Sequence, residues 1–125
     1  MQRRVSWNDC DPSGRIRFQA PFDWFVDAEV EFLRARGVAW VFGAMPRVAA
    51  SATYRTALVF DDAITVALEV TEIGRSSLVY GFVVEREREE AVRGSVTCVY
   101  VVDGRSAVIP EDVRAALASP RAAPA

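Results

Sequence analysis

The sequence contains no histidine, and its 15 basic residues are all arginine. Without an imidazole the chain has no Ser-His-Asp or Cys-His arrangement, no histidine metal ligand and no histidine general base. Without lysine it has no Schiff-base amine and no Ser-Lys dyad. An enzyme with this sequence must therefore take its acid, base or nucleophile from Asp, Glu, Tyr, Ser, Thr, Arg or Cys.

Cysteine is also scarce, since only Cys10 and Cys98 are present. Two cysteines do not make a disulfide framework, and without histidine they cannot supply the four ligands of a structural zinc site. We therefore expect no metal and no cofactor, and we interpret both cysteines as small, buried hydrophobic residues.

Long apolar runs are missing as well. The longest, Val38–Val41 and Val96–Val102, are far shorter than the roughly 18 residues of a membrane helix, and no signal-like apolar segment follows the first residues. The formal net charge of -2, from 15 basic and 17 acidic residues, gives no positive field of the kind that attracts nucleic acid. These absences predict a cytoplasmic protein that binds neither nucleic acid nor membrane.

What the sequence does contain is enough apolar side chains for one core. At 125 residues, 51% of them apolar, the chain fits a single domain. We expect this domain to span residues 1–118, followed by a frayed, Pro/Ala-rich tail at 119–125.

A buried helix is expected after the turn-forming residues Asp9–Gly14. Pro21 suits its first turn and Gly37 its end. The apolar residues between them occupy much of the helix circumference, as in a helix that is buried on most sides; they are Phe22, Trp24, Phe25, Val26, Val30, Phe32 and Leu33.

Strands are expected in the second half. From about Arg47 the apolar period changes, and Ile64–Val70 alternates between apolar and polar residues, which indicates a strand with one better-buried face. The remaining elements are an extended start at 3–8, strands at 77–86 and 92–102 around a charged tip at 87–90, and a short helix from 110 to about 118. This order predicts an α+β fold in which an antiparallel sheet wraps around one long central helix.

The run Asp11-Pro12-Ser13-Gly14 has two interpretations. In the structural one it is a type I turn, in which Asp11 caps through its side chain and proline presets φ at the second position. In the functional one Asp11 lies beside the start of the buried helix, whose first N–H groups have no partner within the helix. Such a pair suits a thioester: the N–H groups bond the carbonyl oxygen as it gains charge, while the carboxylate attacks the carbon or deprotonates a water.

These residues also carry a family resemblance. The run Trp7–Phe18, followed by Ala28–Arg34 and Gly37, resembles the hotdog-fold acyl-CoA thioesterases of the 4-hydroxybenzoyl-CoA thioesterase type. The most specific part is Asp-x-Asp-Pro-x-Gly at Asp9–Gly14. The likeness continues in order through Tyr54-Arg55, Asp61-Asp62, 72–77 and 109–111. It implies a hotdog fold and a hydrolase that releases a free acid from acyl-CoA or an acyl-carrier protein.

The resemblance also implies roles for single residues. Asp11 matches the catalytic aspartate, Asp9 is either a supporting residue or merely solvated, and the electrophilic backbone N–H lies near Phe18. Family members dimerise so that two sheets join, with active sites at the interface, and often pair again, so a homodimer or homotetramer is implied. From a neighbouring chain, the turn residues Arg75, Ser76 and Ser77 would contact the CoA or pantetheine arm; the other candidates for substrate contact are Gly14, Ile16, Phe22 and Trp24.

Several alternatives stay open. Phe18, Phe22 and Trp24 either pack in the core or line an acyl pocket. For Glu31, on the helix, we expect a capped or buried structural role. Arg75 either binds phosphate or is solvated at its turn; because lysine is absent, arginine would have to bind a CoA phosphate.

Two rival functions also remain. The first is that of a non-catalytic acyl-thioester-binding hotdog protein, because fold does not determine function. A dehydratase or polyketide-processing enzyme ranks below that, because such relatives commonly depend on histidine.

Overall fold

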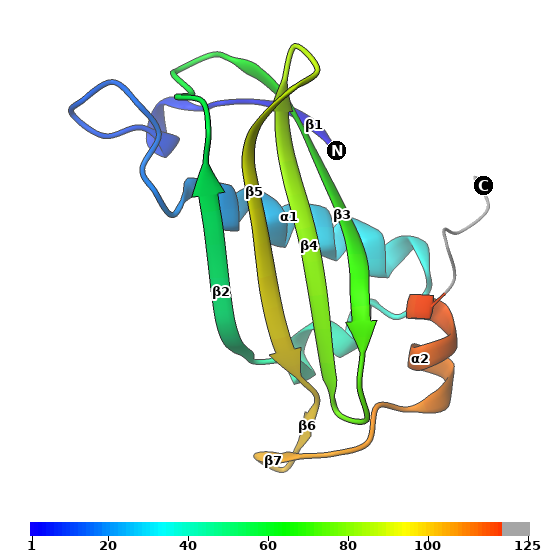
Figure 1. The fold of residues 1–125 in the computed structure, drawn as a ribbon. Helices are drawn as coiled ribbons and strands as arrows, with labels where there is room; N and C mark the ends of the chain where they lie inside the picture. Colours follow the sequence, from blue (N-terminus) through cyan, green and yellow to red (C-terminus); the bar gives the residue numbers. More distant parts are fainter. Residues whose placement is uncertain (119–125) are drawn as a thin grey trace.

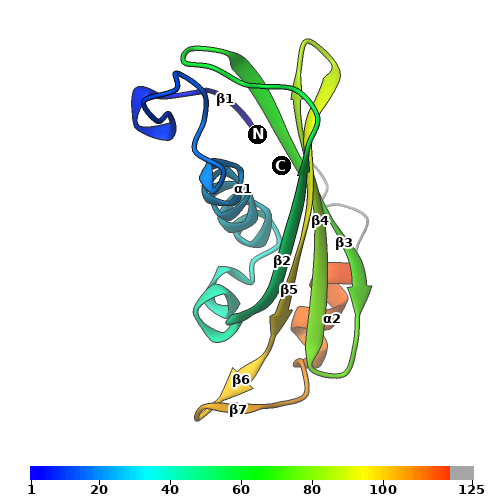
Figure 2. The same cartoon turned by 60° about the vertical axis from the view of Figure 1, so that its left-hand side comes forward.

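A five-stranded antiparallel sheet curves around one helix in the computed structural model, which describes residues 1–118 (Figure 1). The helix α1 (Ala20–Ala35) lies on one side of the sheet, as the view in Figure 2 shows. The strands are β1 (Gln2–Arg4), β2 (Arg47–Tyr54), β3 (Ala63–Ile73), β4 (Ser77–Arg86) and β5 (Glu89–Val99). The predicted α+β fold, a hotdog arrangement of sheet and central helix, is confirmed.

The strand order in the sheet is β1-β3-β4-β5-β2. Strands β3, β4 and β5 form the predicted antiparallel meander, whereas β2 pairs with β5 and lies at an edge. Along β2 the inward-facing residues Ala50, Ala52 and Tyr54 stand opposite Val96, Gly94 and Val92 of β5. The edge strand therefore presents mostly small side chains toward the layer that contains α1.

The core lies between α1 and the inner face of the sheet. Pro21 is in the first turn of α1, and Gly37 follows the helix with a φ of 74°, as expected for a helix stop. The Phe25 ring contacts the rings of Tyr80 and Phe82, with centroids 5.3 and 5.2 Å apart. These aromatic contacts hold the helix against β4.

Short elements complete the fold. They are the 3-10 helices η1 (Trp7–Asp9) and η2 (Ala39–Ala44), the small hairpin of β6 (Val101–Val102) and β7 (Arg105–Ser106), and the helix α2 (Glu111–Ala118). None of the helices within residues 1–118 has both the length and the apolar character needed to cross a membrane. The predicted tail at 119–125 lies outside the described residues.

Three boundaries differ from the prediction. The extended start ends at Arg4, because the next residues close into η1. The strand predicted at 92–102 breaks at Tyr100, whose N–H donates to the Ser76 carbonyl, 2.7 Å away, outside the sheet ladder. The charged tip is shorter than predicted: Glu87 and Arg88 form the turn with positive φ, and β5 begins at Glu89.

Candidate active site

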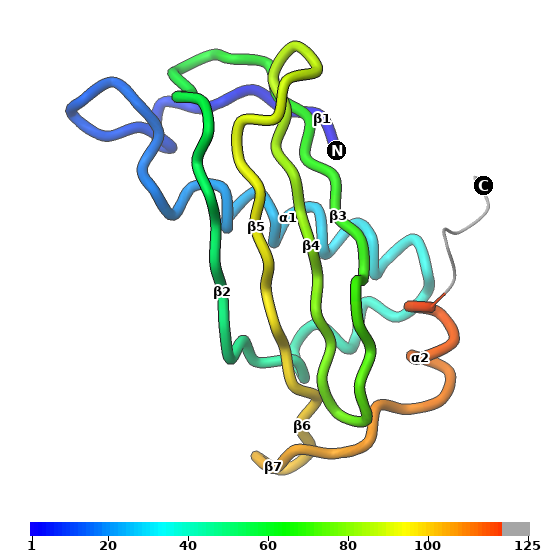
Figure 3. Tube along the Cα trace, viewed as in Figure 1, coloured from blue at the N-terminus to red at the C-terminus, as the bar shows by residue number. Residues whose placement is uncertain are grey.

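A tight hairpin at residues 10–16 projects beside the end of β2 (Figure 3). The Asp11 N–H donates to the Arg15 carbonyl, and the Gly14 N–H donates to the Asp11 carbonyl, both at 2.9 Å. Gly14 has a φ of 83°, which glycine adopts without steric cost. The turn predicted from Asp-Pro-Ser-Gly is therefore present.

The Asp11 carboxylate is exposed and caps its own turn. Its Oδ1 accepts hydrogen bonds from the Ser13 hydroxyl and from the Ser13 N–H, the latter at 2.8 Å. These two bonds, the hydroxyl first, lower the pKa of Asp11 below its ordinary value. Within residues 1–118, Oδ2 accepts no hydrogen bond, so the group is an ionised carboxylate with one oxygen available for chemistry.

The head of α1 carries two donors that have no partner among residues 1–118. The N–H groups of Phe18 and Gln19 make no hydrogen bond to any other group in the described part of the chain. Phe18 is 75% exposed. It borders a pocket of about 310 Å³, which is lined by Arg15, Ile16, Phe18, Tyr54, Arg55, Thr56, Ala57 and Leu58. The helix start therefore opens onto a hollow whose wall is the end of β2 and the segment after it.

Asp11 and Phe18 line different hollows of the single chain. Asp11 borders a separate hollow of about 280 Å³ with Trp7, Cys10 and Pro12. The two hollows are neighbours through the hairpin, because Cys10, which lines the Asp11 hollow, pairs with Ile16, which lines the Phe18 pocket. The projecting hairpin and the start of α1 lie at the same end of the molecule (Figure 3). Within residues 1–118, Asp11 and Phe18 nevertheless line separate hollows and not one shared cavity.

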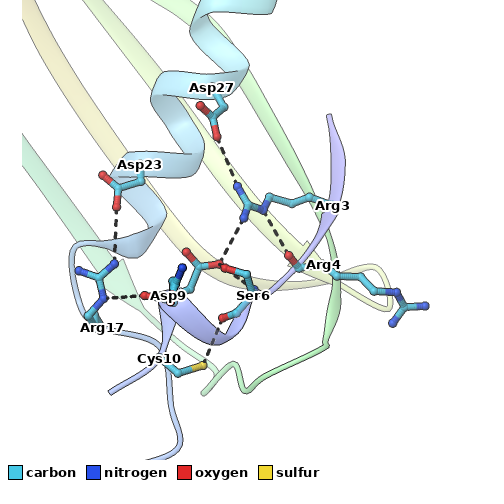
Figure 4. Close-up of polar contacts among 9 residues, drawn as sticks. Arg3, Arg4, Ser6, Asp9, Cys10, Arg17, Asp23 and Asp27 are labelled. Atoms are coloured by element: carbon cyan, nitrogen blue, oxygen red, sulfur yellow. Dashed lines mark hydrogen bonds and ion pairs between the residues drawn. The ribbon is translucent and has the colours of Figure 1, made fainter. Parts of the chain in front are cut away.

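Asp9 anchors the residues before the turn (Figure 4). It is 7% exposed, and its Oδ2 accepts hydrogen bonds from the Ser6 N–H at 2.8 Å and the Ser6 hydroxyl at 2.9 Å. Arg3 reaches the same oxygen at 3.3 Å and also contacts Asp27 of α1 at 3.4 Å. Asp9 is thus a buried structural acceptor, and the solvated alternative is wrong.

Arg17 anchors the residues after the turn in the same way. Its N–H donates to the Asp9 carbonyl at 2.7 Å, and its Nε donates to the Asn8 carbonyl at 3.1 Å. Its guanidinium also lies 4.0 Å from the Asp23 carboxylate in the first turns of α1 (Figure 4). The hairpin that carries Asp11 is therefore tied to α1 from both of its ends, through Arg3 to Asp27 and through Arg17 to Asp23.

The other predicted contact residues at this end fall into different environments. Ile16 lines the pocket with Phe18, and Gly14 lies at the exposed turn. Phe22 is half-buried against Phe82, with ring centroids 5.7 Å apart. Trp24 has no exposed surface, so its side chain belongs to the core, where the Arg3 guanidinium lies over the ring. Core packing therefore accounts for Trp24, whereas Phe18 borders the pocket at the start of α1.

Arg75, Ser76 and Ser77 lie at the β3–β4 turn, at the opposite end of the sheet from the Asp11 hairpin (Figure 1). Arg75 is exposed, and with Ser76 it lines a small hollow of about 90 Å³ beside β7. Within one chain these residues do not meet Asp11.

The two cysteines offer no reactive thiolate. Burial raises the pKa of the Cys98 thiol, and burial together with the Asp9 and Asp11 carboxylates raises the pKa of the Cys10 thiol. Cys98 is buried as predicted, whereas Cys10 is only half-buried because it lies in the projecting hairpin. Across residues 1–118, no three Cys, Asp or Glu side chains gather closely enough to hold a metal ion.

Two important contacts were not anticipated from the sequence. Glu29 of α1 is fully buried and pairs with Arg47 of β2, whereas Glu31, the expected structural glutamate, is exposed. The sequence did indicate that Glu29 would be buried, because it lies four residues from both Phe25 and Leu33 and so shares the buried face of the helix with them. The second contact is a hydrogen bond from the Tyr54 phenol to the carbonyl of residue 18, which no local pattern indicates.

Known proteins match nearly the whole chain. A family model described as "Thioesterase-like superfamily" matches residues 5–117. A "Putative esterase" of Aquifex aeolicus (strain VF5) is 25% identical over 119 residues, which cover 90% of this chain and 91% of that protein.

Two solved structures of Thermus thermophilus proteins have the same fold. One, a hypothetical protein, is 25% identical with a TM-score of 0.87, covering 94% of this chain and 95% of that one. The other, a thioesterase complexed with coenzyme A and Zn, is 23% identical with a TM-score of 0.84, covering 93% of this chain and 90% of that one.

Proposed function

The chain belongs to the thioesterase-like superfamily, and from this premise we propose that it is a thioester hydrolase that releases a free acid from an acyl-CoA. The observation that carries the proposal is the ionised Asp11 carboxylate, held on a turn beside a helix head whose N–H groups have no partner in the described chain. Because histidine and lysine are absent, no imidazole or side-chain amine competes for the role of base or nucleophile.

In the proposed reaction Asp11 acts through its Oδ2. The carboxylate either attacks the thioester carbonyl carbon or removes a proton from a water that attacks it. The N–H groups at the head of α1 bond the carbonyl oxygen as it becomes negative. The carbon–sulfur bond then breaks, the thiolate leaves and takes up a proton, and the acyl group is released as a carboxylic acid, directly or after water hydrolyses the acyl-aspartate.

We further propose that the active site is completed between two copies of the chain. β2 is an exposed edge strand without a charged residue after Arg47, which is the kind of edge that pairs with another strand. Beside it, the half-buried Phe22, Val26 and Val30 form an apolar stripe along α1. Joining two sheets at β2 would cover this stripe, and a second pairing would give a homotetramer.

In such an assembly the turn at 75–77 of one subunit would lie at the active site of its partner. We propose that Arg75, Ser76 and Ser77 contact the CoA or carrier arm, which fits a chain whose cations are all arginine. Gly14, Ile16 and Phe22 are proposed to contact the acyl side. The pocket at Phe18 is lined by apolar residues together with Arg15 and Arg55, so it offers the acyl group an apolar surface bordered by two cations.

A panel of acyl-CoA thioesters, assayed for free thiol, tests the proposal. Replacing Asp11 with Asn should lower kcat by about 10³-fold with a smaller change in KM. D103N is the matched control, because Asp103 is an exposed aspartate in the distant turn between β6 and β7. Full activity of D11N would contradict the assignment. Binding of a thioester without thiol release by the wild-type protein would favour a non-catalytic acyl-thioester-binding protein instead.

A further inference from the structure

Tyr54, the last residue of β2, donates a hydrogen bond from its phenol to the carbonyl oxygen of Phe18. The contact joins the edge strand to the residue before the head of α1, 36 positions away in the sequence. The backbone beside Tyr54 is itself held, because the N–H groups of Arg55 and Thr56 both donate to the Ala91 carbonyl, at 2.8 and 3.3 Å. The phenol is therefore presented from an anchored strand end.

This contact, together with one backbone hydrogen bond, holds two successive peptide units in place: the unit between Arg17 and Phe18 and the unit between Phe18 and Gln19. The Arg17 carbonyl accepts a hydrogen bond from the Ala20 N–H at 3.0 Å, and the Phe18 carbonyl accepts one from Tyr54. Every peptide bond in residues 1–118 is trans, so the N–H of each unit points away from its carbonyl. Holding the two carbonyls also sets the directions of the Phe18 and Gln19 N–H groups. These are the two donors of the helix head that find no partner in the described part of the chain.

Within residues 1–118, the peptide unit between Phe18 and Gln19 makes no hydrogen bond other than the one from Tyr54. The units on either side are held separately, because the Arg17 carbonyl accepts from the Ala20 N–H and the Gln19 carbonyl accepts from the Phe22 N–H at 3.0 Å. The Phe18 side chain is largely exposed, and Gln19, at the N-cap position, makes no side-chain capping bond. If this unit rotated, its carbonyl oxygen would take the place of its N–H, and an acceptor would then repel the negative oxygen of the tetrahedral intermediate.

Resting on the proposed function, we infer that Tyr54 is a positioning residue for thioester hydrolysis. Its phenol holds the Phe18 carbonyl in place, so that the neighbouring N–H groups stay directed at the oxygen that gains charge. Tyr54 acts through the backbone at residues 18 and 19 and not by proton transfer to the substrate.

Replacing Tyr54 with Phe removes the phenol oxygen and keeps the ring. We expect kcat to fall about 10-fold to 100-fold, the size of effect produced by a misplaced catalytic donor, while KM changes less than about threefold. Y80F is the matched control, since Tyr80 is also a sheet tyrosine whose ring contacts Phe25, but it lies in the core near Glu29. Y80F should keep kcat within about twofold, whatever its thermal stability.

A second variant separates the hydrogen bond from ring packing. Replacing Tyr54 with 4-aminophenylalanine keeps a donor at the para position, and we expect it to restore most of the kcat lost in Y54F. Failure of this rescue, a Y54F kcat within about twofold of wild type, an effect confined to KM, or an equal loss in Y80F would each overturn the positioning role.

These measurements also distinguish the role of Tyr54 from the proposed function, thioester hydrolysis. Hydrolysis by the wild-type protein with an unchanged Y54F kcat overturns the role of Tyr54 and leaves the proposed function standing. Absence of thiol release from every thioester by the wild-type protein overturns the proposed function itself.

Discussion

Glu29 of α1 and Arg47 of β2 form a two-pronged ion pair beneath the central helix. Arg47 Nη1 lies 2.9 Å from Glu29 Oε2, and Nη2 donates to Oε1. Arg47 Nη1 also donates to Cys98 Sγ at 3.0 Å. Glu29 is fully buried, so its carboxylate is not hydrated, and the Arg47 guanidinium compensates for the lost hydration. The pair ties the start of the edge strand to the middle of the helix, while Tyr54 ties the other end of the same strand to the helix head.

Replacing Glu29 with Gln should lower the free energy of unfolding by about 3 kcal/mol, because removing one partner of a buried ion pair leaves the other charge uncompensated. Denaturant unfolding followed by circular dichroism measures this change. E31Q, on the exposed side of the same helix, should stay within about 0.5 kcal/mol of wild type. Equal stabilities of E29Q and E31Q would show that the pair contributes nothing.

Replacing Asp9 with Asn should lower the unfolding free energy by about 1 to 3 kcal/mol, because the buried oxygen that accepts from Ser6 and Arg3 loses its charge. We also expect a smaller loss of kcat than in D11N, because the Asp9 carboxylate is engaged in holding the hairpin and has no assigned contact with the reacting atoms. D61N, at an exposed position whose φ of 71° asparagine tolerates, is the control. A kcat loss as large as that of D11N would place Asp9 in the chemistry.

The pH dependence of kcat/KM should reflect the lowered pKa of Asp11. In the proposed mechanism the Asp11 carboxylate acts in its ionised form, so a lowered pKa should keep activity down to more acidic pH. Replacing Ser13 with Ala removes the hydroxyl that is the largest cause of the shift, so the pKa should rise and activity should be lost at a higher pH on acidification. S13T keeps a hydroxyl and should retain the wild-type acid limb. If S13A and wild type lost activity at the same acidic pH, protonation of Asp11 would not be what controls activity.

The proposed pairing at β2 predicts a dimer in solution. Replacing Ala50, an exposed residue on the inner side of β2, with Glu should weaken dimerisation by about 100-fold or more, because each subunit would bury an unpaired charge. Sedimentation analysis measures the dissociation, and kcat should fall in parallel as monomers form. A115E, on the exposed side of α2, is the control. A fully active wild-type monomer would rule out a shared active site.

Much of this molecule follows from its amino-acid sequence alone, where the deciding forces act over a few residues. Pro12 and Gly14 favour the turn that presents Asp11, because proline presets φ and glycine accepts a positive one. The alternation through Ile64–Val70 determined a strand with one buried face. The absence of histidine and lysine excluded imidazole and lysine-amine chemistry before any fold was known, which left a short set of residue types that includes the carboxylates.

Only the tertiary structure decided which distant residues meet. The sequence placed Phe18 and Trp24 together at the start of a helix, but the packing of the sheet buries Trp24 and leaves Phe18 exposed. Likewise, no local pattern joined Glu29 to Arg47. Local preferences extend over about one helical turn, whereas burial and long-range hydrogen bonds depend on which elements pack together. For that reason the turn, the helix and the candidate carboxylate were predictable, and the contacts that hold the helix head in place were not.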